Sequence, residues 1–147
     1  MPVISNPKLR RLYDYWSTKR GDRKLPSRAD LDPVEMAFII GNVILIDVLE
    51  GTPPQFRIRL HGTNLAERVG YELTGKMLDD MPTPGFRELS RRTFAKAVRT
   101  REPVHSLNER VMDDQVHRYE VLVLPLSADG ERIDMLLTGL IYEDFRR

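Results

Sequence analysis

Three segments of this chain are apolar at both odd and even positions, and this feature restricts the possible folds more than any other. They are 42–49, 118–126 and 132–142. A strand that is apolar on both parities is buried on both faces, as in the centre of a covered sheet. The sequence Ala128-Asp129-Gly130, near the start of the third segment, is a strong hairpin signal. We therefore expect an antiparallel sheet with both faces covered.

Two further segments complete the predicted sheet. Segment 56–61 alternates between apolar and polar residues, and a turn at 51–54 pairs it with the strand before it. Segment 104–112 is followed by Asp113 and Asp114, which mark a connection to the next strand. Simple alternation puts Phe56, Ile58 and Leu60 on one face of their strand, and Arg57, Arg59 and His61 on the other.

The first predicted element is a helix. Asn6 suits its cap, Pro7 suits its first turn, and Gly21 is a natural stop. Its apolar stripe follows helical spacing and consists of Leu9, Leu12, Tyr13 and Trp16. We expect residues 1–34 to form an N-terminal helical extension, followed by a single domain at 35–147.

Other helices are predicted around the first hairpin. Asp32 and Pro33 favour a short helix through about residue 38, and Thr63 or Asn64 can cap another. The glycine- and proline-containing stretch 70–85 leaves room only for short turns, and a longer helix follows from about residue 84. The fold class is therefore α+β: a five-stranded antiparallel sheet with short helices and one longer helix on one face, plus the N-terminal helix.

Composition excludes several classes of function. The chain has 147 residues, 23 basic and 22 acidic side chains, and no cysteine. The absence of a basic excess argues against nucleic-acid binding, and the absence of cysteine excludes disulfides, thiol catalysis and thiolate metal sites. No apolar run is long enough to cross a membrane, and the N-terminus has no export signal. We expect a cytoplasmic protein that binds neither nucleic acid nor membrane.

The sequence gives little support for catalysis or metal binding. None of the motifs of nucleophile-elbow hydrolases, zinc proteases or phosphate-binding loops is present. The histidines are His61, His105 and His117, and their spacing does not suit a metal site. We expect no catalytic residues and no metal. Arg59 could bind an anionic group, although an ion pair with an acidic residue is the more ordinary interpretation.

Several motifs resemble the PAS domain, a sensory and dimerisation module. Leu60-His61-Gly62-Thr63 resembles its strand-to-helix junction, and Gly70-Tyr71-Glu72-Leu73-Thr74-Gly75-Lys76 resembles its glycine turn. The stretches 12–16, 25–33 and 123–130 are similar to a bacterial subfamily of small stand-alone PAS proteins. The resemblance implies a PAS-like fold and a sensory or adaptor role in signal transduction. Haem-binding members take a histidine from the helical region, and flavin photoreceptors need a cysteine, so this chain matches neither; the cofactor remains unknown.

The predicted ligand pocket lies between the sheet and the helices and would be largely apolar. Strand parity alone does not say which face meets the helices. The candidate pocket residues are Phe56, Ile58, Arg59, Leu60, His61, Tyr71, Phe86, Phe94, Val121 and Leu137. There are two alternatives to a ligand sensor. One is a ligand-free structural dimerisation module, and the other, less favoured, is a small α+β enzyme.

The apolar strands also predict a homodimer. The helices after the first hairpin can cover only one face of the sheet, and the N-terminal helix is narrow compared with the other face. A symmetric partner would cover the remainder; the alternative is that the single helix and its connector seal this face within one monomer. The predicted interface is the stripe of Leu9, Leu12, Tyr13 and Trp16 together with the outer face of the sheet, and a signalling protein is a further possible partner.

Overall fold

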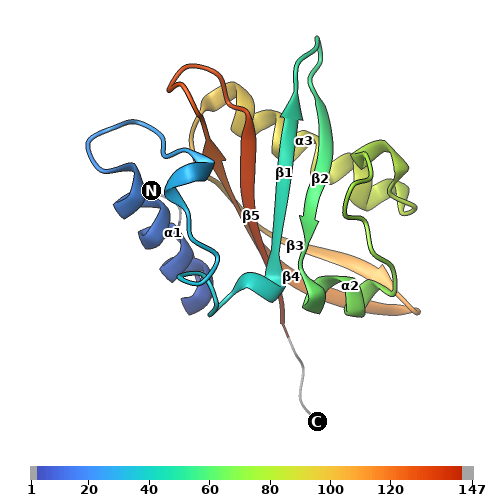
Figure 1. Ribbon diagram of the computed structural model, residues 1–147. Coiled ribbons are helices and arrows are strands. Elements are labelled where there is room, and N and C mark those ends of the chain that lie inside the picture. Colours follow the sequence, from blue (N-terminus) through green and yellow to red (C-terminus); the bar gives the residue numbers. More distant parts are fainter. Residues whose placement is uncertain (1–2, 144–147) are drawn as a thin grey trace.

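The predicted five-stranded antiparallel sheet is confirmed by the computed structural model, which describes residues 3–143 (Figure 1). The strands are β1 (Val43–Leu49), β2 (Gln55–His61), β3 (Val104–Met112), β4 (Gln115–Leu126) and β5 (Met135–Tyr142). The strand order is β2-β1-β5-β4-β3, so β2 and β3 are the two edges. All neighbouring strands are antiparallel, and the pairing of β1 with β5 joins the β1–β2 hairpin to the three later strands.

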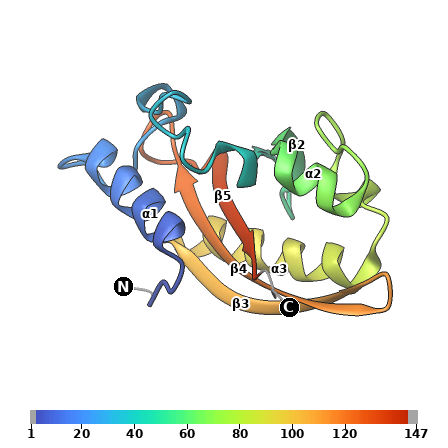
Figure 2. The same cartoon turned by 90° about the horizontal axis from the view of Figure 1, so that it is seen from below.

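The helices lie on both sides of this sheet. In Figure 2, α1 lies on one side of β4 and β5, and α2 and α3 lie on the other. We call the side of α2 and α3 the inner face and the side of α1 the outer face. The helices are α1 (Pro7–Arg20), α2 (Thr63–Val69) and α3 (Pro84–Thr100), with short 3-10 turns at Arg28–Asp30, Ile40–Asn42 and Leu78–Asp80.

Local signals place α1 as predicted. The Asn6 side chain accepts hydrogen bonds from the backbone N–H groups of Lys8 and Leu9, and Gly21 ends the helix with φ at 57°. The helix then packs very closely on β5. A Cβ atom at Gly139 would lie 2.6 Å from Cδ2 of Leu9, so glycine is required for this approach.

The stripe expected to meet a second copy is used within one chain. Leu9 and Leu12 are fully buried, Trp16 is 2% exposed, and only Tyr13 is half-buried. Trp16 Nε1–H also donates to the Pro125 carbonyl at 2.9 Å. Leu9, Leu12 and Trp16, three of the four residues predicted to form the dimer interface, therefore pack on the outer face of their own sheet and are not exposed to a partner.

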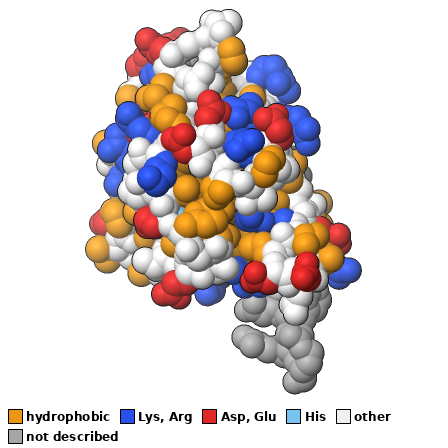
Figure 3. Space-filling model, turned by 90° about the vertical axis from the view of Figure 1, so that its right-hand side faces the viewer, with side chains coloured by type: hydrophobic (Ala, Val, Ile, Leu, Met, Phe, Trp, Pro, Cys, Tyr) orange, Lys and Arg blue, Asp and Glu red, His pale blue; other side chains and the backbone are white. Residues whose placement is uncertain are grey.

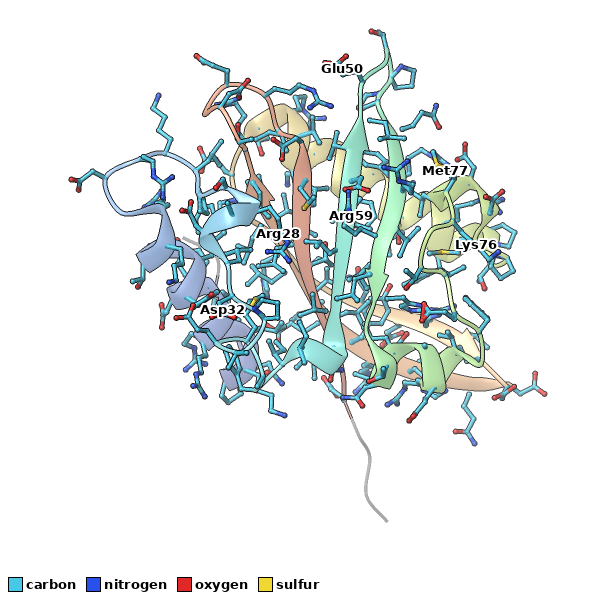
Figure 4. All side chains as sticks on the ribbon, in the orientation of Figure 1. Arg28, Asp32, Glu50, Arg59, Lys76 and Met77 are labelled. Carbon is cyan, nitrogen blue, oxygen red and sulfur yellow. The ribbon has the colours of Figure 1, made fainter. Side chains whose placement is uncertain are left out.

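Two other groups cover more of the outer face. Segment 25–42 lies in front of β5 beside α1 (Figure 4) and buries Leu25, Leu31, Met36 and Ile39. Further along, Asp47 of β1 is almost buried because Arg57 and Arg59 of β2 both bind its carboxylate, at 3.1 and 2.9 Å. An ion-pair cluster thus covers the outer face at the β1–β2 end of the sheet.

Three predicted boundaries differ from the structure. The short helix expected through residue 38 is a series of turns, because the backbone bonds of Glu35, Met36 and Ala37 reach back three residues rather than four. Strand β4 starts earlier than predicted because Met112 pairs directly with Gln115 across a two-residue turn. Strand β5 starts later because residues 131–134 stay in the loop, where Asp129 accepts two backbone N–H groups.

Candidate functional site

A cavity of about 50 Å³ lies between the inner face of the sheet and the helices. By volume it would hold about three to five water molecules. Its floor comes from all five strands, and its roof comes from α2, α3 and the segment between them. The roof segment is tied to the sheet edge, because Ile58 donates to the Lys76 carbonyl at 2.8 Å and Gly75 donates back to Ile58 at 2.6 Å. Figure 4 shows Lys76 and Met77 beside β2.

A β-bulge in β2 decides which side chains face this cavity. Leu45 of β1 pairs with Leu60, but the next residue, Ile46, pairs with Ile58, so Arg59 is the extra residue. The bulge reverses the alternation of the strand from this point on. His61 therefore turns to the cavity, and Leu60 turns to the outer face, where it is 36% exposed.

The structure brings six of the ten candidate pocket residues to the cavity. Its lining includes Ile58, His61, Tyr71, Phe86, Phe94 and Val121. The other four are placed elsewhere. Leu60 is displaced by the bulge, and Arg59 pairs with Asp47 on the outer face. Leu137 lies on the same face of β5 as Gly139, and that face packs against α1. Phe56 is on the inner face but packs against Phe94, with ring centroids 5.5 Å apart, rather than lining the cavity.

His61 is a buried, neutral hydrogen-bond acceptor at the β2 end of the cavity. Its Nδ1 accepts the backbone N–H of Leu73 at 3.1 Å, which requires this nitrogen to be unprotonated. Burial lowers the pKa of His61, and the Glu72 carboxylate, 3.4 Å from Nδ1, opposes this only in part. The imidazole thereby holds the glycine turn that roofs the cavity.

At the opposite edge of the sheet, Arg110 of β3 carries a buried positive charge into the cavity. The residue is only 9% exposed. Its guanidinium lies 3.8 Å from the centroid of the Phe86 ring and contacts two neutral hydroxyls, Tyr142 at 3.3 Å and Thr83 at 3.4 Å. Within residues 3–143, no carboxylate forms an ion pair with it.

Two tyrosines extend this end of the cavity. The ring centroids of Tyr119 and Tyr142 lie 5.4 Å apart, and those of Tyr119 and Phe86 lie 5.7 Å apart. Burial, together with the neighbouring Tyr142, raises the pKa of Tyr119 to about 12, although Arg110 acts in the other direction. Tyr119 is therefore protonated at neutral pH, and no other described residue forms a hydrogen bond with its hydroxyl.

The buried polar atoms that lack partners also gather here. Among the described residues, only Arg110 Nε and Thr138 Oγ1 are fully buried side-chain polar atoms without a hydrogen-bond partner, and both residues line the cavity. Such groups are rare in folded proteins because each costs the desolvation of a polar atom. Their coincidence in one cavity distinguishes this place from the rest of the core.

With the fold and cavity described, comparison with known families becomes informative. The sequence matches the PAS domain family over residues 4–142, which is nearly the whole chain. The chain belongs to the PAS domain family. This family is sensory and does not generally consist of enzymes, and PAS domains commonly mediate protein interactions and dimerise. A comparison with curated proteins gives no match.

Solved PAS structures support the fold. The PAS domain of Bordetella pertussis BvgS superposes with a TM-score of 0.55 at 17% identity, covering 79% of this chain and 90% of that one. A PAS domain from Colwellia psychrerythraea gives 0.50 at 15% identity, covering 78% and 98%. The Rhodobacter sphaeroides LOV protein gives 0.52 at 12% identity, covering 76% and 68%. At these identities the likeness concerns the PAS fold alone.

Other possible sites are less developed. Over residues 3–143 there is no helix long and apolar enough to cross a membrane. The same residues contain no group of three potential metal-ligating side chains. On the side of the PAS domain seen in Figure 3, acidic and basic side chains are intermixed around a small hydrophobic area. The cavity is therefore the best-defined candidate site.

Sequence reasoning missed the most informative residue of this PAS domain. Strand β3 reads V-H-S-L-N-E-R-V-M, which does not alternate cleanly, so Arg110 resembles any solvated arginine. Its burial depends on Phe86 and Tyr142, which come from distant elements. By contrast, Asp47 could have been noticed, because a single carboxylate inside an apolar strand requires a partner.

Proposed function

We propose that this chain is a sensory PAS protein that binds a small ligand in the cavity and transmits its presence through protein–protein contacts. The fold and family support a sensory role. The cavity lies between the two edges of the sheet, and its roof is held by few backbone bonds. A ligand that bridges floor and roof would change how firmly that roof is held.

One observation carries the ligand-binding part of the proposal. Arg110 Nε and Thr138 Oγ1 are buried without partners, and both line the same cavity. A ligand that supplied hydrogen bonds to these atoms would remove two desolvation costs at once. Largely apolar walls with a few polar groups are the usual composition of a small-molecule site.

Native mass spectrometry tests this directly. We expect the purified full chain to carry a bound small molecule, seen as a mass above that of the denatured chain. The variant Thr138→Val, which keeps the side-chain shape but removes one unpartnered hydroxyl, should retain less of it. Identical native and denatured masses, together with no binding from a library of small metabolites, would overturn ligand binding.

A ligand-free structural module is the second candidate, and the small size of the cavity favours it. In that case the two unpartnered atoms only lower the free energy of unfolding. Thr138→Val would then raise the free energy of unfolding and have no other effect. Loss of a retained small molecule in this variant separates the two functions.

For protein contact, we propose the outer face of the β3–β4 hairpin, which α1 leaves uncovered. Leu107, Val111 and Val116 are 65%, 66% and 55% exposed. Val111 pairs directly with Val116, and Leu107 is on the same face of β3. Exposed apolar side chains that share one face suit a self-complementary contact between two copies of the chain.

Light scattering at tens of micromolar decides this point. We expect the wild-type chain to be dimeric and Val111→Glu to be monomeric, since a charge would be buried in the contact. Val34→Glu is the matched control, because Val34 is 80% exposed on a distant turn. A wild-type monomer, or a dimer that survives Val111→Glu, would exclude this interface.

A further inference from the structure

Arg110 is a cation in a cavity that offers it no anion. Its guanidinium faces Phe86 from α3, the Tyr142 hydroxyl from β5 and the Thr83 hydroxyl from the start of α3. All three are neutral. A buried charge is normally paired, because moving it out of water is costly. Since no described residue supplies the counter-charge, an anionic ligand is the natural source.

The Nε edge of the guanidinium is buried without a partner and has the shape that a carboxylate requires. Nη1 and Nη2 make long bonds to neutral hydroxyls, whereas Nε has no partner. A carboxylate can bind Nε and a neighbouring Nη with two parallel hydrogen bonds. The Tyr119 hydroxyl, protonated and unpaired among the described residues, lies on the same lining and can donate a third.

The rest of the cavity limits the other end of the ligand. Beyond the arginine, the floor and roof are mostly aliphatic, with Ile44, Ile46, Leu65, Val121 and Leu140. Arg110 is the one positively charged side chain in the lining formed by residues 3–143. The other basic side chain there, His61, is neutral at pH 7 because burial lowers its pKa. One cation matches one negative charge, which favours a carboxylate over a phosphate dianion.

We propose that the cavity takes a small organic carboxylate, with its carboxylate on the Nε edge of Arg110 and its hydrocarbon part against the aliphatic walls. This inference rests on the proposed ligand-binding function and specifies its ligand class. The small cavity favours a short hydrocarbon part over a long acyl chain.

Isothermal titration calorimetry with three probes of equal chain length tests the ligand class. They are propionate, 1-propanol and propylamine, added to the full chain freed of bound molecules. We expect propionate to bind about 10- to 100-fold more tightly than 1-propanol, as charge-assisted hydrogen bonds require, and propylamine to bind least. Equal binding of propionate and 1-propanol would overturn the carboxylate assignment but leave ligand binding intact. Binding of none of the three would overturn the assignment as well.

Variants at the arginine test the geometry. Arg110→Met should lose the preference for propionate and keep any binding of 1-propanol, while Arg92→Met, at an exposed arginine of α3, should bind like wild type. Arg110→Lys keeps the charge but not the fork, so its affinity for propionate should fall about tenfold. It also provides the test if Arg110→Met does not fold. Wild-type affinity in Arg110→Lys would overturn the side-on contact.

The stability of the empty variants provides a separate check. If Arg110 serves a ligand, Arg110→Met should unfold at the same or a higher temperature than the empty wild type, since an unpaired buried charge is removed. If Arg110 instead holds the fold through Phe86 and Tyr142, the variant should unfold at a lower temperature. That lower temperature, with unchanged propionate preference in Arg110→Lys, would contradict the proposal.

Discussion

Nε2 of His105 lies 2.6 Å from Oε2 of Glu120, and this pair anchors the N-terminal segment to the sheet. The Glu120 carboxylate also accepts the backbone N–H groups of Ser5 and Asn6, at 2.8 and 2.9 Å. Asn6 in turn caps α1. A nearly buried carboxylate on β4 therefore fixes the point at which α1 begins.

Removal of this carboxylate should weaken the whole fold. Glu120→Ala leaves two backbone donors and the imidazole without their acceptor in a nearly buried place, so we expect a loss of about 2–4 kcal/mol in the free energy of unfolding. Urea denaturation measures it. Glu109→Ala, which removes an exposed ion pair with Arg118 on the same sheet face, should cost less than about 1 kcal/mol. Equal losses in the two variants would contradict the anchoring role of Glu120.

The contact between α1 and β5 gives a second prediction. In Gly139→Ala the new methyl group would lie 2.6 Å from Cδ2 of Leu9 and 3.0 Å from Cδ2 of Leu12. Both leucines are fully buried and have little room to move, so we expect a loss of about 1–3 kcal/mol. Gly85→Ala is the control, because nothing lies within 4 Å of its added carbon. Thermal unfolding of the two variants compares them, and an unchanged melting temperature for Gly139→Ala would show that the helix can shift.

The aromatic end of the cavity should make the protein sensitive to alkali. Burial raises the pKa of Tyr119 to about 12 in the folded chain, whereas an unfolded tyrosine titrates near 10. Between these values the unfolded state loses its proton first, so stability falls as pH rises from about 10 to 12. Tyr119→Phe should lack this part of the loss. Urea denaturation at pH 9 and pH 11 measures the difference, which would be zero if Tyr119 ionised normally.

Much of the fold was predictable because its signals are local. The cap at Asn6, the stop at Gly21 and the turn at Asp113–Asp114 each depend on a few neighbouring residues. The two-sided apolar strands also predicted correctly that other elements pack on both faces of the sheet. The sequence also placed the N-terminal helix on the outer face. It did not decide whether segment 25–42 adds to this cover, because that segment has no regular period and its buried residues become apparent only against β5.

The candidate site was predictable only in part, for reasons of register. The sequence F-R-I-R-L-H alternates without interruption, so nothing in it indicates a bulge at Arg59. The bulge lets Arg57 and Arg59 both reach Asp47, which lies on the neighbouring strand β1. A one-residue change of register reverses every later side chain, and Leu60 and His61 exchange faces as a result.

The position of His61 leads to a last prediction, on acid stability. Burial lowers its pKa in the folded chain, with Glu72 opposing only in part, while an unfolded histidine titrates near 6.5. Below pH 6.5 the unfolded state therefore takes up a proton before the folded state does, and stability falls until the folded pKa is passed. Protonation of Nδ1 would also break its bond from the Leu73 N–H. In His61→Gln, which cannot titrate, the free energy of unfolding should fall less between pH 7.5 and pH 5 than in wild type. His117→Gln, at a more exposed position, is the control for removal of a histidine. If wild type and His61→Gln lost equal stability over this range, the imidazole that holds the roof of the cavity would not be the acid-sensitive group.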